Sequence, residues 1–186
     1  MVIIKRSVAE LDAALPHIQS APRDTGVLAM IVRRPAVEAR EVLDEARLDP
    51  VVGLVGDTWP QRPSSRTPDR TPHPEMQLTL MSARVIEAIA GPEGAWPLAG
   101  DQLFVDLDLS AANLLPGTRL AIGEAIVEVS TQPHTGCEKF VRRFGLDAMK
   151  WVNSPAGRAL NLRGINARVI EGGRVRVGDR VARAAS

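Results

Sequence analysis

Short apolar segments separated by glycine-rich turns occupy the second half of the chain, and they constrain its fold more than any other feature. Arg119–Ile122 and Ala125–Val129 have the length and composition of strands, and only a Gly-Glu pair separates them. Ile165–Ile170 and Arg174–Val177 flank a Glu-Gly-Gly sequence, which predicts a hairpin. Several short strands with turns of this kind favour a mostly-β barrel with peripheral helices, an α+β arrangement.

The first half of the chain predicts one buried strand and two helices. Gly26–Val32 is a continuous apolar run of strand length. Ser7-Val8-Ala9-Glu10 has the pattern of a capping box and predicts a short helix that Pro16 ends. A second helix is predicted to begin at Pro35 and to stop before Pro50, because its apolar residues recur at helical spacing. Those apolar residues are Val37, Val42, Leu43 and Ala46.

The middle of the chain predicts a strand over Gln77–Leu80, a helix over Ser82–Ala90 and a half-buried strand over Leu103–Leu109. The Gly-Pro pair after the helix is a stop signal. The length of 186 residues suits one domain and is short for two. We therefore expect an N-terminal helical extension over residues 1–25 and one barrel domain over residues 26–186.

Composition excludes several classes of protein. Apolar residues make up 45% of the chain and charged residues 24%, as in soluble globular proteins. No apolar run approaches the roughly 20 residues that cross a bilayer, and the opening residues lack the features of a signal peptide. The single cysteine excludes an internal disulfide. These observations predict a cytoplasmic protein without membrane contact.

The charge balance argues against nucleic acid as a partner. The chain has 23 basic and 22 acidic residues, a formal net charge of +1, and only 3% aromatic residues. Binding to nucleic acid normally needs a basic excess or a basic stripe. We expect no nucleic-acid partner.

The segment Arg62–Pro74 is predicted to be a loop. Its four prolines lack the backbone N–H and fix the backbone angle φ, which excludes both a helix and a central strand. A segment of this length without regular structure is either a functional loop or disordered. It contains Arg66, Arg70 and His73, and we expect His73 to be exposed to solvent.

The segment Gln132–Phe144 is the most informative for chemistry. It directly follows a predicted strand, so it leaves the end of a sheet as a loop. Pro133 and Gly136 bracket a turn that presents Cys137 at its tip. A helix is predicted to start after the cysteine and to run to Trp151, and the positive end of its dipole would lie near the thiol.

Basic residues surround this cysteine in the sequence. His134 and Lys139 lie within three residues of Cys137, and Arg142 and Arg143 lie within six. Positive charge near a thiol stabilises the thiolate, which is the form that acts as a nucleophile, a sulfur acceptor or a metal ligand. We predict that Cys137 is catalytic or binds a metal, with His134 and Lys139 keeping its thiolate charged.

Each of these residues also has an ordinary structural interpretation. A lone cysteine in a soluble domain is most often a small buried hydrophobic residue. His134 can be a hydrogen-bonding loop residue, and Arg142 and Arg143 can be solvated helix residues. The three histidines and one cysteine do not have the spacing of a zinc site. The polar and charged neighbours of Cys137 favour the reactive interpretation.

The run that begins at Pro133, Pro-His-Thr-Gly-Cys-Glu-Lys-Phe-Val-Arg-Arg-Phe-Gly, resembles the cysteine motif of MOSC domains. This family is named after the C-terminal domain of molybdenum-cofactor sulfurases. Other segments resemble the family in the same order, so the resemblance covers about Pro50 to Val181. These segments are Gly53–Asp57, Gln77–Ser82, Leu115–Gly123, Arg163–Val169 and Val177–Asp179.

The resemblance implies a barrel like the one inserted in pyruvate kinases. It also implies that Cys137 carries sulfur as a persulfide or binds the molybdenum of a pterin cofactor, molybdopterin. In sulfurases a pyridoxal-phosphate desulfurase domain supplies the sulfur. This chain has no room for such a domain, so the donor would be a separate cysteine desulfurase and the acceptor a molybdoenzyme.

A pterin cofactor would need cationic partners for its phosphate, and a bidentate arginine suits that group. The candidate cofactor-binding residues are Arg142, Arg143, Asp57, Arg66 and Asn113, with Arg70 and Arg163 as further arginines. Two departures from the family affect the reaction more than the fold. The His-Gly-Gly motif of many stand-alone bacterial members is absent, and a region containing Asn113 stands where a Glu-Asn pair is common.

Three functions follow as hypotheses, and they leave open whether the protein is an enzyme. The first is sulfur transfer or handling of the molybdenum cofactor through Cys137. The second is a cofactor-bound reductase of N-hydroxylated compounds, in which Cys137 ligates molybdenum and a separate protein donates electrons. The third is a non-catalytic ligand-binding barrel. Molybdenum content distinguishes the second from the first, and an unreactive Cys137 would indicate the third.

Overall fold

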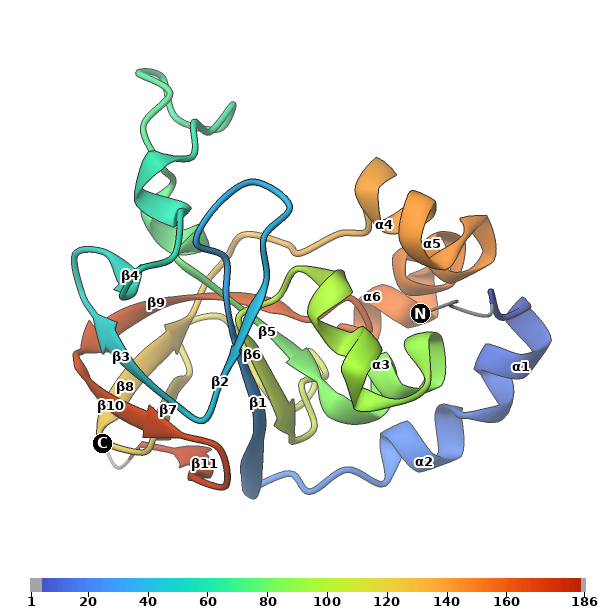
Figure 1. Ribbon diagram of the computed structural model, residues 1–186. Coiled ribbons are helices and arrows are strands. Elements are labelled where there is room, and N and C mark those ends of the chain that lie inside the picture. The colour runs from blue at the N-terminus through green and yellow to red at the C-terminus, as the bar shows by residue number, and fades with distance from the viewer. Residues whose placement is uncertain (1–4, 185–186) are drawn as a thin grey trace.

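The computed structural model describes residues 5–184, and at its centre is a closed barrel of seven strands (Figure 1). The barrel strands are β1 (Thr25–Arg33), β5 (Leu78–Ser82), β6 (Leu103–Asp106), β7 (Arg119–Ile122), β8 (Ala125–Val129), β9 (Ile165–Glu171) and β11 (Arg180–Arg183). Around the barrel the order is β1, β11, β7, β8, β9, β5 and β6, and β6 pairs with β1 to close it. Only β5 and β6 run parallel among these neighbours. The strands predicted on either side of the Gly-Glu turn are confirmed as β7 and β8.

The helices gather on one side of the barrel in Figure 1, which confirms a barrel with peripheral helices. Helices and strands take up about equal shares of the described residues, so α+β describes the fold better than mostly β. The α-helices are α1 (Val8–Ala13), α2 (Leu15–Gln19), α3 (Ala83–Ala90), α4 (Glu138–Phe144), α5 (Leu146–Asn153) and α6 (Pro155–Ala159). The 3-10 helices are η1 (Trp59–Gln61), η2 (Pro74–Met76) and η3 (Glu93–Ala99).

Further strands lie beside the barrel. β2 (Glu41–Leu43) extends the barrel sheet by pairing with β1. β3 (Glu45–Asp49), β4 (Gly53–Leu54) and β10 (Gly173–Arg176) form a small antiparallel sheet in the order β10, β3, β4. Two of the sequence predictions are wrong in this part of the molecule.

The helix predicted over residues 35–49 is wrong, because β2 and β3 occupy this segment. Leu43 pairs with Ile31 of β1, and Val37 and Val42 are 84% and 57% exposed. The apolar residues therefore do not form one buried helical face. Partner strands β1 and β10 provide the backbone hydrogen bonds, and this tertiary pairing outweighs the helical spacing of the sequence.

The hairpin predicted over residues 165–177 is also wrong, although both of its strands exist. β9 pairs with β8 and β5 in the barrel, whereas β10 pairs with β3 in the small sheet. The chain passes from one sheet to the other at Gly173, where a Cβ atom would lie 2.4 Å from the carbonyl oxygen of Glu124. Local sequence indicates the strands and the turn, but it does not indicate which strand each one pairs with.

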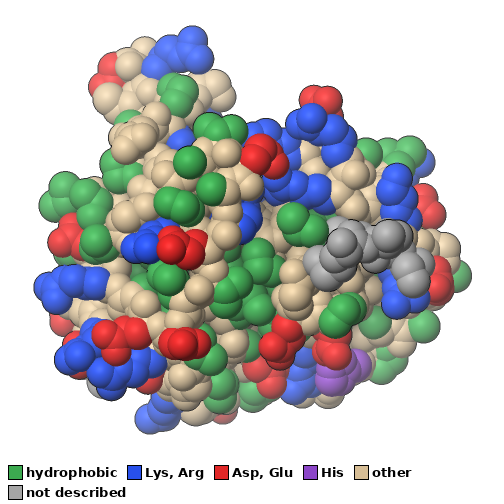
Figure 2. All heavy atoms as spheres, viewed as in Figure 1, with side chains coloured by type: hydrophobic (Ala, Val, Ile, Leu, Met, Phe, Trp, Pro, Cys, Tyr) green, Lys and Arg blue, Asp and Glu red, His purple; other side chains and the backbone are tan. Residues whose placement is uncertain are grey.

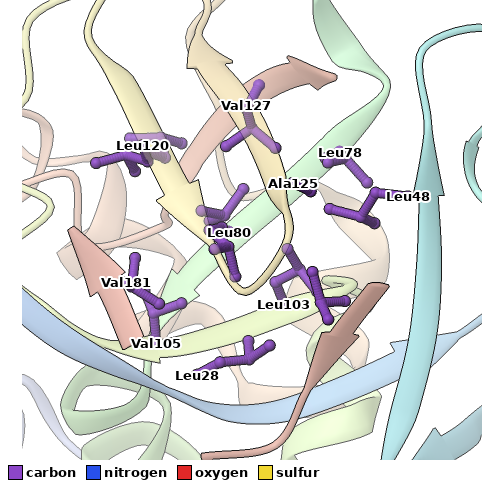
Figure 3. Close-up of a cluster of buried hydrophobic side chains, with 14 of the residues drawn as sticks. Leu28, Leu48, Leu78, Leu80, Leu103, Val105, Leu120, Ala125, Val127 and Val181 are labelled. Carbon is purple, nitrogen blue, oxygen red and sulfur yellow. The ribbon is translucent and has the colours of Figure 1, made fainter. Parts of the chain in front are cut away.

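Both faces of the barrel wall are buried on the side that the helices cover. Leucine and valine side chains from the barrel strands fill its interior (Figure 3). A second apolar cluster lies between the outer face and the helices, and it contains Met81 and Phe104. Strand β6 places Leu103 and Val105 in the interior cluster and Phe104 in the outer one, so it is buried on both faces rather than half-buried as predicted. It also ends at Asp106, three residues before the predicted end.

The helix signals in the sequence were partly correct. The capping box is confirmed, because the Ser7 side chain accepts from the backbone N–H of Glu10 and the Glu10 side chain reaches back to Ser7. Pro16 does not end that helix but lies in the first turn of α2. The single helix predicted after Cys137 is broken in two at Gly145, whose φ of 93° is left-handed.

The N-terminal helices lie on the helical side of the barrel, where the indole N–H of Trp151 donates to Asp12 of α1 at 2.9 Å. The domain boundary at residue 26 stays a prediction. Residues 1–4, which belong to the segment considered for a signal peptide, and residues 185–186 lie outside the described residues. Among the helices of residues 5–184, none has both the length and the apolar character to span a bilayer.

Gly26 tests the closure of the barrel. A Cβ atom at this position of β1 would lie 2.1 Å from the carbonyl oxygen of Asp106, so alanine must displace β1 from β6. We expect Gly26→Ala to lower the free energy of unfolding in urea by about 1–3 kcal/mol. Gly178→Ala is the control, because its Cβ meets no atom within 4 Å and only the left-handed backbone is strained. Equal effects of the two substitutions would contradict this account.

Candidate functional site

A cleft of about 590 Å³ opens on the surface where loops of the barrel meet helix α4. Its walls come from the β1–β2 loop, the segment from η1 to η2, the residues that follow η3 and the loop that leads into α4. Residues 62–73 have no regular structure, as predicted, and in Figure 1 this segment projects from the top of the barrel. Lys and Arg side chains gather in the upper middle of Figure 2, beside the projecting segment.

Cys137 lies on this cleft with its thiol exposed. It is the residue before α4, with extended backbone angles φ −121° and ψ 178°, and its side chain makes no capping hydrogen bond. The position at the tip of a loop agrees with the sequence prediction, and the interpretation as a buried hydrophobic residue is excluded. An exposed thiol on a cleft can reach both a bound ligand and a partner protein.

Two asparagines hold the loop that carries Cys137. The side chain of Asn153 in α5 accepts from the N–H of Gly136 at 2.9 Å and donates to its carbonyl oxygen at 3.1 Å. Asn166 of β9 donates to the carbonyl oxygen of Gln132 at 3.1 Å. Both anchors lie in the residues just before Cys137, so the cysteine has a defined place despite its exposure.

The lining of the cleft is strongly basic. Seven Lys and Arg side chains and a single carboxylate, that of Glu38, belong to it. Because the molecule as a whole has a formal net charge of only +1, this positive charge is local. The basic residues are Arg34, Arg40, Arg62, Arg66, Lys139, Arg143 and Arg163.

Three of these arginines crowd one wall. Arg34 is neutralised by buried Asp57, with Nε and Nη2 each 2.7 Å from a carboxylate oxygen. Burial and the charge of Arg34 lower the pKa of Arg62 to about 10. Burial and the charges of Arg143 and Arg34 also lower the pKa of Arg40, whose Nε is buried without a hydrogen-bond partner among the described residues. Such a group of cations is suited to an anionic ligand.

Glu38 forms ion pairs with the two cations of helix α4 that line the cleft, Arg143 and Lys139. Its carboxylate lies 2.5 Å from Nη2 of Arg143 and 3.7 Å from Nζ of Lys139. The hydrogen bond from Arg143 lowers the pKa of Glu38, so this carboxylate is ionised at neutral pH. Arg143 also donates to the carbonyl oxygen of Leu98 at 2.6 Å, which fixes the guanidinium on the cleft wall.

His134 has a different place from the one predicted. Its side chain is 14% exposed, and Nδ1 lies 3.5 Å from Oδ1 of Asp101, which is fully buried. Burial lowers the pKa of His134 well below its ordinary value, and the charges of Arg163 and Arg34 act in the same direction. The imidazole is therefore neutral at pH 7. The prediction that His134 contributes positive charge beside Cys137 is wrong.

The structure brings together some of the predicted residues and separates the others. Cys137, His134, Lys139, Arg143 and Arg66 all lie on the cleft, and so do Arg163 and His73. Arg142 is exposed and Arg70 lies on the projecting segment, both outside the lining.

Asp57 and Asn113 also lie outside the lining. The carboxylate of Asp57 forms an ion pair with Arg34. The side-chain amide of Asn113 donates to the carbonyl oxygens of Arg23 and Asp108 at 2.9 and 2.8 Å. Both side chains are buried and fully engaged in holding the fold. Direct contact with a cofactor does not fit these placements.

Sequence reasoning missed several residues of the cleft. Arg40 belongs to the segment mistaken for a helix, Arg34 directly precedes that segment, and Arg62 is the first residue of the proline-rich loop. Asp101 lies just before β6 and Asn166 lies near the start of β9. Neither residue carries a local signal of a site. Arg34 and Arg62 each stand directly before a proline, and these Arg-Pro pairs were the one local signal available.

Comparison with known families decides the assignment. The family model for the MOSC domain matches residues 73–182, which is more than half of the chain. The chain belongs to the MOSC domain family. The matched region contains Cys137 and most of the barrel, whereas the arginines of the β1–β2 loop and Arg62 precede it. No match was found among curated proteins.

Solved structures share the fold of this MOSC domain. The YuaD protein from Bacillus subtilis is 18% identical with a TM-score of 0.61, and the match covers 87% of this chain and 97% of that one. YiiM from Escherichia coli is 20% identical with a TM-score of 0.56, covering 86% and 70%. YiiM from Geobacillus stearothermophilus is 14% identical with a TM-score of 0.53, covering 89% and 75%. Similarity at this level of identity supports the fold alone.

The positive potential at Cys137 can be measured with two alkylating reagents. Iodoacetate is an anion and iodoacetamide is neutral, and both react with the same thiolate, so the ratio of their rates reports the local charge. We expect Lys139→Gln to lower the iodoacetate-to-iodoacetamide ratio by about twofold to fivefold. High salt should reduce the ratio of the unmodified protein in the same way.

Lys150→Gln is the matched control, because Lys150 is exposed on α5 and does not line the cleft. Its ratio should equal that of the unmodified protein. A ratio that Lys139→Gln leaves unchanged would contradict the account of a basic cleft around the thiol.

Proposed function

We propose that this MOSC domain binds the molybdenum cofactor in the basic cleft and acts on it through Cys137. The observation that supports the proposal is an exposed, unpaired thiol on the same cleft as seven basic side chains. A soft thiolate suits a transition metal, and the guanidinium groups suit a phosphate.

The arginine wall fits the phosphate of such a cofactor. Arg40 and Arg62 have no carboxylate partner among the described residues, and Arg40 has a buried Nε without an acceptor. A phosphate between them would accept charge-assisted hydrogen bonds and would offset the burial and the charge of Arg34 that lower the pKa of Arg62. Arg34, which Asp57 holds in place, would add a third guanidinium to the lining beside this pair.

The rest of the cleft fits a flat polar ring system. Trp59 and Met76 contribute apolar surface, and Phe140 lies under the guanidinium of Arg163 at 4.9 Å. Oδ1 of Asn166 is buried and lacks a hydrogen-bond donor among the described residues. A ring that carries N–H groups could provide the missing donor after a small movement of this side chain.

When bound, the cofactor would supply a metal centre able to exchange oxygen or sulfur atoms. The chain's own part is to offer the Cys137 thiolate as a ligand, to neutralise the phosphate and to hold both in one place. Asn153 and Asn166 keep the cysteine loop fixed, so the position of the thiol relative to the arginine wall is set before the ligand arrives.

Exposure of Cys137 supports sulfur carriage as a second function on the same site. In that reaction the Cys137 thiolate attacks the outer sulfur of a persulfide on a donor protein. A new S–S bond forms at Cys137, the S–S bond of the donor breaks, and the donor leaves as a thiolate, so no external oxidant is needed. The donor would be a separate pyridoxal-phosphate cysteine desulfurase, and the acceptor a molybdoenzyme or its cofactor.

Cofactor binding is tested by metal content. Protein purified from a host that makes the cofactor should contain molybdenum, together with the fluorescent pterin product released by acid oxidation. We expect Cys137→Ser to lose the metal and Arg62→Gln to reduce loading by about tenfold or more. Arg142→Gln is the matched control, because Arg142 is exposed outside the lining. Absence of both metal and pterin from the unmodified protein would overturn the proposal.

Sulfur carriage is tested separately with cyanide, which releases sulfane sulfur as thiocyanate. After incubation with a cysteine desulfurase and cysteine, the unmodified protein should yield thiocyanate and Cys137→Ser should yield none. Metal without sulfane sulfur would favour the reductase, which needs the cofactor and a separate electron donor. Equal thiocyanate from both proteins would rule out Cys137 as the carrier.

A further inference from the structure

His134 and Asp101 form a buried pair in the wall of the cleft that the chemistry proposed for Cys137 does not use. Nδ1 of His134 lies 3.5 Å from Oδ1 of Asp101, and both atoms are buried without a hydrogen-bond partner in residues 5–184. A movement of a few tenths of an ångström would make this contact a hydrogen bond. The other oxygen of Asp101 is held by Arg163 at 2.7 Å.

The other side of the imidazole faces the cleft. His134 belongs to the lining and is partly exposed, and its Nδ1 is buried, so the exposed part of the ring lies toward Nε2. If Nδ1 carries its proton toward Asp101, Nε2 is left with a lone pair that can accept a proton. In this tautomer Nε2 is a hydrogen-bond acceptor, whereas the Lys and Arg side chains of the lining are all donors.

We propose that the cleft takes up its anionic ligand together with a proton, which His134 holds between Asp101 and the ligand. Asp101 is the positioning residue of this pair, and His134 is the group that touches the ligand. The inference rests on the proposed function only in taking the ligand of the cleft to be an anion.

Three charged groups face His134, and they explain why it is neutral before the ligand binds. Burial is the largest cause that lowers its pKa, and the charges of Arg163 before β9 and Arg34 after β1 lower it further. Asp101, which precedes β6, acts in the opposite direction at 3.5 Å. Burial raises the pKa of Asp101, against the effect of Arg163. An anion beside the arginines would cancel their field at His134 and leave that of Asp101.

The sign of the pH dependence follows from this balance. Ligand binding raises the pKa of His134, so the bound state holds a proton that the free state lacks. By reciprocity, affinity for the anion increases as the pH falls through the range between the two pKa values and is constant outside it. A rise of one pKa unit corresponds to about tenfold tighter binding at the acidic end.

Sulfate is the probe for this proposal, because it is a dianion that does not itself titrate between pH 5 and pH 8. The NMR titration of His134 is recorded with and without sulfate, and sulfate binding is measured by calorimetry in two buffers of different ionisation enthalpy. We expect the midpoint of His134 to rise by about one pH unit or more with sulfate, together with net proton uptake on binding.

Two variants separate His134 from its neighbours. His134→Gln should still bind sulfate at high pH but should lose both the proton uptake and the pH dependence. His73→Gln is the matched control, because His73 also lines the cleft but its Nδ1 already accepts from the N–H of Glu75 at 3.2 Å. Asp101→Asn should reduce the sulfate-induced rise at His134, provided that its amide NMR spectrum shows a folded protein.

Several results would overturn the proposal. Sulfate binding without proton uptake, uptake that persists in His134→Gln, or no sulfate binding at any pH would each do so. If Asp101→Asn fails to fold, the proposal is still tested, because sulfate binding and proton uptake by the unmodified protein and by His134→Gln decide it. The metal-content test of Cys137→Ser is independent, so cofactor binding can stand while the proton linkage fails, and the reverse.

Discussion

Closure of the barrel by β1 is the constraint on which the other features of this molecule depend. β1 pairs with β11 and β2 on one side of its length and with β6 on the other, so its backbone is engaged along most of its nine residues. Its side chains are divided between the two apolar clusters, with Leu28 and Ile31 inside the barrel and Met30 and Val32 under the helices. A bulge between Leu28 and Met30 adjusts this division.

The end of the same strand leads into the cleft, where two buried ion pairs connect the fold to the site. Arg34 follows β1 and is held by Asp57, and Arg163 precedes β9 and is held by Asp101. Each carboxylate is fully buried, and breaking such a pair leaves an uncompensated charge that costs several kcal/mol, about 3–5. These pairs fix two cations in the lining of the cleft, and each buried carboxylate offsets part of the positive charge there.

Positive charge that is free to meet a ligand comes instead from the loops. Arg40 and Arg62 have no carboxylate beside them among the described residues, whereas Lys139 and Arg143 already share Glu38. Arg40 and Arg62 are therefore the cations most open to an anion, and Cys137 belongs to the same lining.

Several local elements, and the place of Cys137 in an exposed loop, could be predicted from the sequence alone. The capping box at Ser7, the strand pair around Gly123-Glu124 and the exposed turn at Cys137 depend on neighbouring residues, so they could be predicted from the chain. The order of several short motifs around one cysteine was also sufficient to indicate the family that the comparison with family models then showed.

The pairing of the strands and the environment of each polar side chain depend on the tertiary structure and could not be predicted from local sequence. The helical spacing over residues 35–49 gave way to pairing with β1 and β10, because backbone partners far away in the sequence determine strands. The sequence did not indicate the surroundings of His134 and Asp57. Burial and the charges of Arg163 and Arg34 keep the first neutral, and Arg34 holds the second in a buried ion pair. Charge and burial at a site depend on such distant neighbours, which no local pattern contains.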